Sequence, residues 1–196
     1  MRKTVTIILA VMTVCLFMGC MAIQSTTETI SDIKEAVEVV KTEVKEEKKT
    51  ESIGPELSVD GPVTFSSASL SGETLTEEIF QGNKVIMVNI FASWCLPCIG
   101  EMPNIEKLYQ NYKDQGFLVL GVYPPDDEAE DVQDIVGLTK VTYPIVKCDE
   151  SLEQFLSGYV PTTFFLDGEG RLLSRNSIVG AKSYKDWETI LKGYLG

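Results

Sequence analysis

A buried strand that leads directly into two closely spaced cysteines is the feature that most constrains the fold of this chain. Residues 84–91, KVIMVNIF, are almost all apolar, which is typical of a strand covered on both faces of a sheet. The segment ASWCLPC follows at residues 92–98, and a helix is predicted from Pro97 to Lys113. A strand, a C-x-x-C pair and a helix in immediate succession favour an α/β fold with the cysteines in the turn.

Strands alternating with helices continue through residues 57–196 and predict an α/β sandwich, a central mixed β-sheet flanked by helices. The other strands are expected in an N-terminal hairpin of 63–65 with 68–70, and at 117–123, 143–147, 162–167 and 171–178. Short helical turns are expected at 75–80 and 151–156. One longer helix is expected to be capped by Asp126 or Asp127, and the last by Ser183, with Trp187 on its apolar stripe.

The N-terminus is similar to an export signal. Two basic residues precede an apolar run over residues 5–18, and Gly19 and Cys20 follow that run. The pattern resembles a bacterial lipoprotein signal, which implies a signal peptide over 1–19, a lipid on Cys20, and a location at the outer face of the cytoplasmic membrane. Two alternatives remain: the uncharged residues 4–23 are long enough to span a membrane, and an ordinary cleavage site fits as well.

Residues 20–56 are predicted to form a charged, lipid-anchored tether. From residue 24 onward this segment holds nine acids, five lysines and no aromatic residue, which is the composition of a solvated linker. The remaining residues, 57–196, are enough to bury a core without the support of disulfides.

Composition excludes several classes of function. The chain has 17 basic and 29 acidic residues, and a net charge of −12 argues against nucleic acid as a partner. It has no histidine, which excludes serine–histidine hydrolases, cysteine–histidine proteases and histidine-ligated metal sites. We therefore expect neither a metal nor a cofactor, and proton transfer must use a carboxylate, a thiol, a lysine or water.

The C-x-x-C pair predicts thiol–disulfide chemistry. The free N–H groups and the dipole of a helix N-terminus stabilise a thiolate, so Cys95 is expected to be exposed with a lowered pKa, and Cys98 to be shielded. A purely structural disulfide is disfavoured because so short a loop removes little chain entropy. Half of a zinc site is disfavoured because the chain has no second C-x-x-C motif and no histidine. The motif favours attack by Cys95 and resolution by Cys98.

At these residues the chain resembles the thioredoxin superfamily, and more narrowly the TlpA/ResA-type membrane-anchored thiol–disulfide oxidoreductases. The segment VNIFASWCLPC, residues 88–98, is similar to the active-site strand and turn of that family. Three further motifs stand where the family has them: Glu101, Pro103 and VPTTF at 160–164. The resemblance implies a thioredoxin-like domain over 57–196, with an extra βα insert around 121–140.

The resemblance also implies roles for residues around the cysteines. Glu101 is expected to be the general base for Cys98, because Asn89 stands where thioredoxins have a buried aspartate and cannot titrate. The alternative for Glu101 is an exposed surface glutamate. Pro161 is expected to be cis, which leaves the Val160 backbone free to pair with a substrate chain. The expected substrate-binding residues are Trp94, as a partly exposed lid, together with Pro97, Val160 and Pro161.

The function implied by the resemblance is the reduction of protein disulfides outside the cytoplasm by a monomer. A membrane thiol transporter of the CcdA/DsbD type is the expected electron source. The expected substrates are oxidised proteins, such as apocytochrome c or methionine sulfoxide reductase. One alternative, a thiol peroxidase, requires a threonine where Ala92 stands. Another, a copper-binding assembly factor of the same fold, requires a distal histidine.

Two other features have structural interpretations. Cys148 follows the predicted strand 143–147 and is interpreted as an inert, semi-buried cysteine, with a regulatory thiol as the alternative. The acidic residues between 126 and 134 lack the spacing and the glycine of a calcium-binding loop, so a solvated helix face is expected there.

Overall fold

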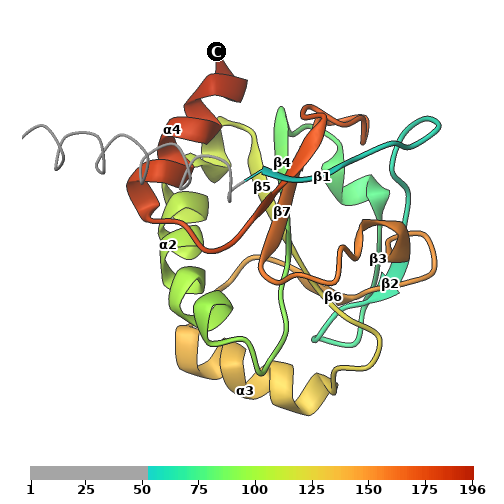
Figure 1. Ribbon diagram of the computed structural model, residues 1–196, viewed down its shortest axis with the longest axis vertical. Helices are drawn as coiled ribbons and strands as arrows, with labels where there is room; N and C mark the ends of the chain where they lie inside the picture. Colours follow the sequence, from blue (N-terminus) through green and yellow to red (C-terminus); the bar gives the residue numbers. More distant parts are fainter. Residues whose placement is uncertain (1–52) are drawn as a thin grey trace, which may run out of the picture. The chain divides into compact units, whose positions relative to one another are not determined.

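The structure is a computed structural model that describes residues 53–196; the predicted signal peptide, Cys20 and most of the predicted tether lie outside the described residues. The strands are β1 (Ile53–Glu56), β2 (Ser66–Ala68), β3 (Thr74–Thr76), β4 (Val85–Ile90), β5 (Phe117–Tyr123), β6 (Ile145–Lys147), β7 (Thr162–Leu166) and β8 (Asn176–Val179). Six of them form one mixed sheet in the order β1-β8-β7-β4-β5-β6, while β2 and β3 form a separate hairpin (Figure 1).

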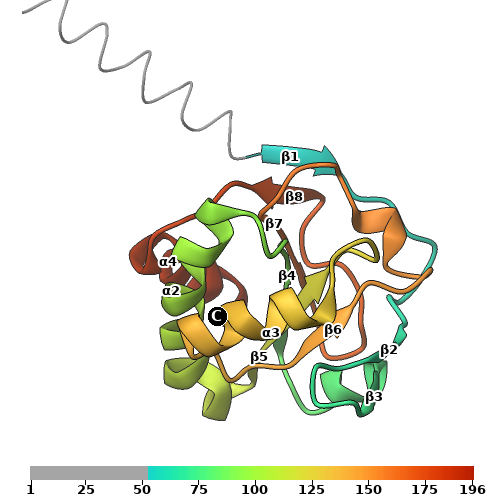
Figure 2. The same ribbon diagram turned by 90° about the horizontal axis from the view of Figure 1, so that it is seen from below.

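Helices cover the sheet. The α-helices are α2 (Leu96–Tyr112), α3 (Ala129–Thr139) and α4 (Tyr184–Leu195), and the 3-10 turns are η1 (Glu77–Phe80), η2 (Lys113–Gln115) and η3 (Glu153–Phe155). Figures 1 and 2 show α2 and α4 side by side on one face of the sheet, with the β2–β3 hairpin toward the other. Within residues 53–196, no helix has the length and the apolar character needed to cross a membrane.

The central strand β4 is buried along its whole length because the sheet has a core on each face. Val85 and Met87 belong to the core beneath α2 and α4, whereas Ile86 and Val88 belong to the core on the hairpin side. Alternate residues of a strand point to opposite faces, so a continuous apolar run is needed to fill both cores. The predicted central mixed sheet flanked by helices is therefore confirmed.

The hairpin and the last strand differ from the sequence-based expectation. The predicted pairing of 63–65 with 68–70 is wrong: β2 pairs with β3, in a register that places Ser67 opposite Leu75. Val63 and Phe65 are buried in the core on the hairpin side without being in a strand, and the Val63 N–H donates to the Gly170 carbonyl. The predicted strand 171–178 begins only at Asn176.

Strand β1 was not expected and lies within the segment assigned to the tether. It pairs antiparallel with β8, with Ile53 opposite Ile178. The sequence IGPE is typical of a linker, but a proline is tolerated in a strand at the edge of a sheet. Gly54 is required there, because a Cβ at this position would collide with the Ser177 side chain.

Candidate active site

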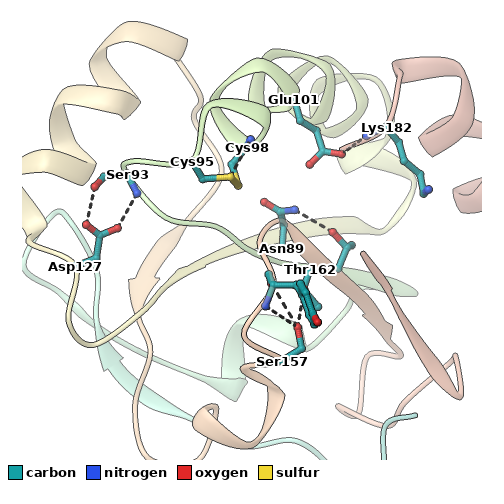
Figure 3. Close-up of a disulfide and its surroundings, with 11 residues drawn as sticks. Asn89, Ser93, Cys95, Cys98, Glu101, Asp127, Ser157, Thr162 and Lys182 are labelled. Carbon is teal, nitrogen blue, oxygen red and sulfur yellow. Dashed lines mark hydrogen bonds between the residues drawn. A yellow bond between two sulfur atoms is a disulfide. The ribbon is translucent and has the colours of Figure 1, made fainter. Parts of the chain in front are cut away.

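Cys95 and Cys98 form a disulfide at the N-terminus of α2 (Figure 3). Cys95 is the N-cap residue, and its Sγ accepts a hydrogen bond from the Cys98 N–H at 3.2 Å. Pro97 lies in the first turn of the helix, where its missing N–H leaves no helical hydrogen bond unmade. The local sequence therefore starts the helix at the position that brings the two sulfur atoms together.

The expectation that Cys95 is exposed is wrong for this oxidised form. Cys95 is 4% exposed and Cys98 is 1% exposed, because both side chains turn inward and join the core beneath α2. The residues on either side of Cys95 have the opposite character: Trp94 is 74% exposed and Leu96 is 78% exposed. The disulfide is thus flanked by two apolar side chains that project into solvent. Trp94 is more exposed than was expected of a partly exposed lid.

Glu101 is buried one helical turn beyond Cys98, with 2% of its surface exposed. This excludes the alternative of an exposed surface glutamate. Its Oε1 accepts two hydrogen bonds, from the Lys182 backbone N–H at 2.6 Å and from Trp187 Nε1–H at 2.7 Å. Its Oε2 has no hydrogen-bond partner among residues 53–196. Figure 3 shows the carboxylate between the disulfide and Lys182.

Burial raises the pKa of Glu101 to about 7, because removing water disfavours the charged carboxylate. The two N–H donors, the positive charge of Lys182 and the Asn89 amide oppose this effect and keep the pKa from rising further. A group with a pKa near the surrounding pH exchanges protons most effectively, so this carboxylate is suited to serve a neighbouring thiol.

Asn89 lies in β4 below the active site, with 1% of its surface exposed. It faces Gly121 of β5 and Thr163 of β7, and its Nδ2 donates a hydrogen bond to Thr163 Oγ1 at 2.9 Å. Its amide therefore holds β7 against β4. The same amide also lowers the pKa of Glu101, so Asn89 acts on the carboxylate without titrating itself.

The Val160–Pro161 peptide bond is cis, as predicted. Pro161 immediately precedes β7, and the loop before it is held by Thr162, whose Oγ1 donates to the Tyr159 carbonyl at 2.6 Å. The Val160 backbone N–H and C=O have no hydrogen-bond partner within the described part of the chain. Pairing of this backbone with a substrate chain stays a prediction.

Asp127 is a site residue that the sequence interpretation missed. The predicted helix cap at Asp126 or Asp127 is wrong, because α3 begins at Ala129 with Glu128 as its N-cap residue. Asp127 is buried instead and accepts two hydrogen bonds from Ser93, from its N–H at 2.7 Å and from its Oγ at 2.6 Å. Figure 3 shows this contact beside the disulfide. The parallel pairing of β4 with β5 could have indicated it, since both strands end at the same edge of the sheet.

Replacing Asp127 by alanine is expected to destabilise the oxidised protein by about 2 kcal/mol, because the Ser93 N–H and hydroxyl lose a charged acceptor. Urea unfolding at neutral pH measures this change. Asp126→Ala is the matched control, since Asp126 is exposed and its replacement should stay within about 0.5 kcal/mol of the parent. Equal unfolding free energies in the two variants would show that the Asp127–Ser93 contact contributes nothing.

Cys148 lies apart from this chemistry. It belongs to the core on the hairpin side of the sheet, whereas Cys95 and Cys98 belong to the core beneath the helices. Burial, with the charge of Asp149, raises the pKa of its thiol to about 12. A protonated, buried thiol is unreactive, which favours the inert interpretation.

A C-x-x-C disulfide at a helix N-terminus, a cis-proline before a central strand and a buried glutamate on the same helix define the class of thioredoxin-like thiol–disulfide oxidoreductases. The chain belongs to the Redoxin family, whose model matches residues 55–179. The predicted family resemblance and fold class are therefore confirmed, and membership of this class implies redox partner proteins in general.

Relatives and solved structures agree with this assignment. Thiol-disulfide oxidoreductase ResA of Geobacillus kaustophilus is 34% identical over 113 residues, which are 56% of this chain and 62% of that protein. Thioredoxin-like protein YneN of Bacillus subtilis is 32% identical over 127 residues, 63% of this chain and 72% of that protein. A thiol:disulfide interchange protein of Chlorobium tepidum superposes with a TM-score of 0.61 at 25% identity, covering 72% of this chain and 100% of its own. StoA of Bacillus subtilis, at 21% identity and a TM-score of 0.54, covers 69% of this chain and 98% of its own and supports the fold alone.

Proposed function

We propose that this protein is an extracytoplasmic oxidoreductase that reduces the disulfides of other proteins through Cys95 and Cys98. The observation that carries the proposal is the Cys95–Cys98 disulfide at the start of α2, with the buried Glu101 one turn further along the same helix. Two cysteines that close a disulfide within one turn exchange two electrons with a substrate disulfide.

The reaction begins with the reduced dithiol. The Cys95 thiolate attacks one sulfur of the substrate disulfide, which forms a mixed disulfide and releases the other substrate sulfur as a thiolate. Glu101 takes the proton of Cys98, and the resulting thiolate attacks Cys95 Sγ. The Cys95–Cys98 disulfide forms and the second substrate sulfur leaves as a thiolate. Glu101 gives up the proton that it took from Cys98, solvent supplies a second proton, and both substrate sulfurs become thiols. The dithiol has then given two electrons to the substrate.

A further turnover needs two electrons from a donor. Cysteines outside the cytosol oxidise readily, so a reductase there depends on reducing power carried across the membrane. We infer a membrane thiol transporter of the CcdA/DsbD type as the donor. Oxidised secreted proteins are the inferred acceptors, with apocytochrome c and methionine sulfoxide reductase as candidates. The names of the ResA relatives support thiol–disulfide exchange in general.

The location is proposed on sequence alone. The lipoprotein-like pattern ending in Gly19 and Cys20 supports a lipid anchor at the outer face of the cytoplasmic membrane. Mass spectrometry of the membrane fraction tests this by the presence of a diacylglyceryl group on Cys20. An intact N-terminal segment in the mature protein would indicate a spanning helix instead.

The reduction potential of the Cys95–Cys98 pair tests the proposed direction of electron flow. Equilibration with glutathione buffers is expected to give a potential below that of glutathione, as a reductase requires. Each molecule of the reduced protein is then expected to open about one disulfide in a model protein substrate. The Cys95–Cys98 dithiol sets this ratio, because it carries two electrons. Cys95→Ser is the control and should open none. A potential above that of glutathione would identify an oxidant rather than a reductase.

A further inference from the structure

We propose that Trp187 is a positioning residue for proton exchange at Glu101: its indole N–H holds one carboxylate oxygen and leaves the other to take the proton. The inference rests on the proposed role of Glu101 as the base for Cys98. Trp187 comes from α4, which packs beside α2, and lies 86 residues from Glu101 in the chain.

The two oxygens of Glu101 have different surroundings. Oε1 already faces two N–H groups, from Lys182 at 2.6 Å and from Trp187 at 2.7 Å. A proton on Oε1 would be directed against those donors. Oε2 is buried and has no hydrogen-bond partner in residues 53–196, so it is the oxygen on which a proton is accommodated. The Asn89 amide also lowers the pKa of Glu101, while its Nδ2 donates to Thr163 Oγ1. Trp187 and Lys182 are the two donors that hold Oε1 and leave Oε2 to exchange the proton.

Trp187 is the part of this arrangement that a side-chain substitution can remove, since Lys182 donates through its backbone. The indole is fully buried, which fixes its orientation. It packs edge-to-face on Phe165, with ring centroids 6.2 Å apart, and the Lys182 Nζ lies 6.0 Å from its ring centroid. Because the indole is already fixed, it orients the carboxylate without losing conformational entropy when the proton moves.

The charge balance around Glu101 gives the sign of the effect. Lys182 supplies a positive charge, Cys98 lies one turn away on α2, and Tyr143 approaches from the segment before β6. Burial raises the pKa of Tyr143, so it is uncharged at neutral pH. The Trp187 N–H stabilises the carboxylate form alone, and its loss must raise the pKa of Glu101.

Trp187→Phe removes the donor and keeps an aromatic ring in the core. We expect the pKa of Glu101 to rise by about 1, the effect of losing one hydrogen bond to a charged group. Infrared difference titration of the carboxyl C=O band measures this, with Glu101→Gln identifying the band. The resolution rate at pH 7 should fall about fivefold, because fewer molecules carry the ionised base, and should recover at higher pH.

Three controls separate a positioning role from a purely structural one. In the Glu101→Gln background, Trp187→Phe should leave the remaining resolution rate unchanged. Leu191→Val removes a methylene from the same helix at a buried position and keeps both donors to Glu101, so it should leave the pKa of Glu101 unmoved. Cys95→Ser/Cys98→Ser in the Trp187→Phe protein should still show the raised pKa, which makes that measurement independent of catalysis.

A measurement on the unaltered protein covers the case in which Trp187→Phe does not fold. The chain has two tryptophans, so two indole N–H signals appear in a nitrogen–proton correlation spectrum. The Trp187 signal is expected to titrate with the midpoint of Glu101 and to lose that inflection in Glu101→Gln. An indole signal that ignores this titration, or an unchanged pKa in a folded Trp187→Phe variant, overturns the inference. A third outcome is a raised pKa of Glu101 in Trp187→Phe together with a normal resolution rate in Glu101→Gln. That outcome supports the effect of Trp187 on Glu101 and refutes the base role assigned to Glu101.

Discussion

Cys98→Ser is expected to accumulate a stable mixed disulfide with its substrate through Cys95, whereas Cys95→Ser is expected to accumulate none. Cys95 is the N-cap residue of α2, and the proposed order of attack assigns it the first contact with an incoming disulfide once the pair is reduced. Cys98 lies one turn inside the helix, and its thiolate is needed to release the substrate. Without it, the intermediate persists and turnover is lost almost completely.

Non-reducing electrophoresis and peptide mapping after incubation with a disulfide-bonded protein measure the trapped species. The double variant Cys95→Ser/Cys98→Ser is the control for adducts at the remaining thiols. Cys148 should contribute none, because it is buried and protonated. Trapping by Cys95→Ser in place of Cys98→Ser would reverse the two roles.

Glu101→Gln is expected to slow resolution by about 100-fold, the low end of the range for loss of a general base. Glutamine keeps the volume and still accepts the hydrogen bonds from Lys182 and Trp187, so the fold and the first attack should be retained. In the parent protein the resolution rate should rise with pH through about 7, as Glu101 loses its proton. The variant should lack this inflection.

Stopped-flow measurements over a pH series give both the rate and the profile. Glu106→Gln is the matched control on the same helix, since the Glu106 carboxylate accepts hydrogen bonds from Thr142 and Gln110 away from the disulfide. It should leave the resolution rate unchanged. If Glu101→Gln gives the parental rate and profile, water or another group removes the proton from Cys98.

The parts of the fold that follow from long patterns were predictable. The apolar run of β4, the C-x-x-C turn and the helix after it each have a strong local signal, and Ser183 caps α4 as expected. The short elements were not predictable in the same way. Strand β1 contains a Gly-Pro pair, and its place in the sheet depends on pairing with β8, a partner more than 100 residues away.

The candidate site likewise has features that could be predicted from the sequence and features that could not. The Cys95–Cys98 pair followed from a local motif, and the cis bond before Pro161 and the role of Glu101 were expected from the family resemblance. The partners of those groups were not predicted. Asp127 was interpreted as a helix cap and Trp187 as an ordinary core residue, because nothing local to either one indicates a contact with Ser93 or Glu101.

The buried carboxyl of Glu101 also makes the stability of the fold depend on pH, because the folded state binds a proton more tightly than the unfolded state does. Its pKa is about 7 in the folded protein and 4.5 for an ordinary glutamate, so between these values the folded chain holds a proton that the unfolded chain has lost. The free energy of unfolding therefore falls as the pH rises through this window, by about 3 kcal/mol in all. Below about pH 4.5 both states are protonated and this penalty is absent. The penalty is largest above about pH 7, so the ionised carboxylate that can accept a proton from Cys98 is also the form that makes the fold least stable.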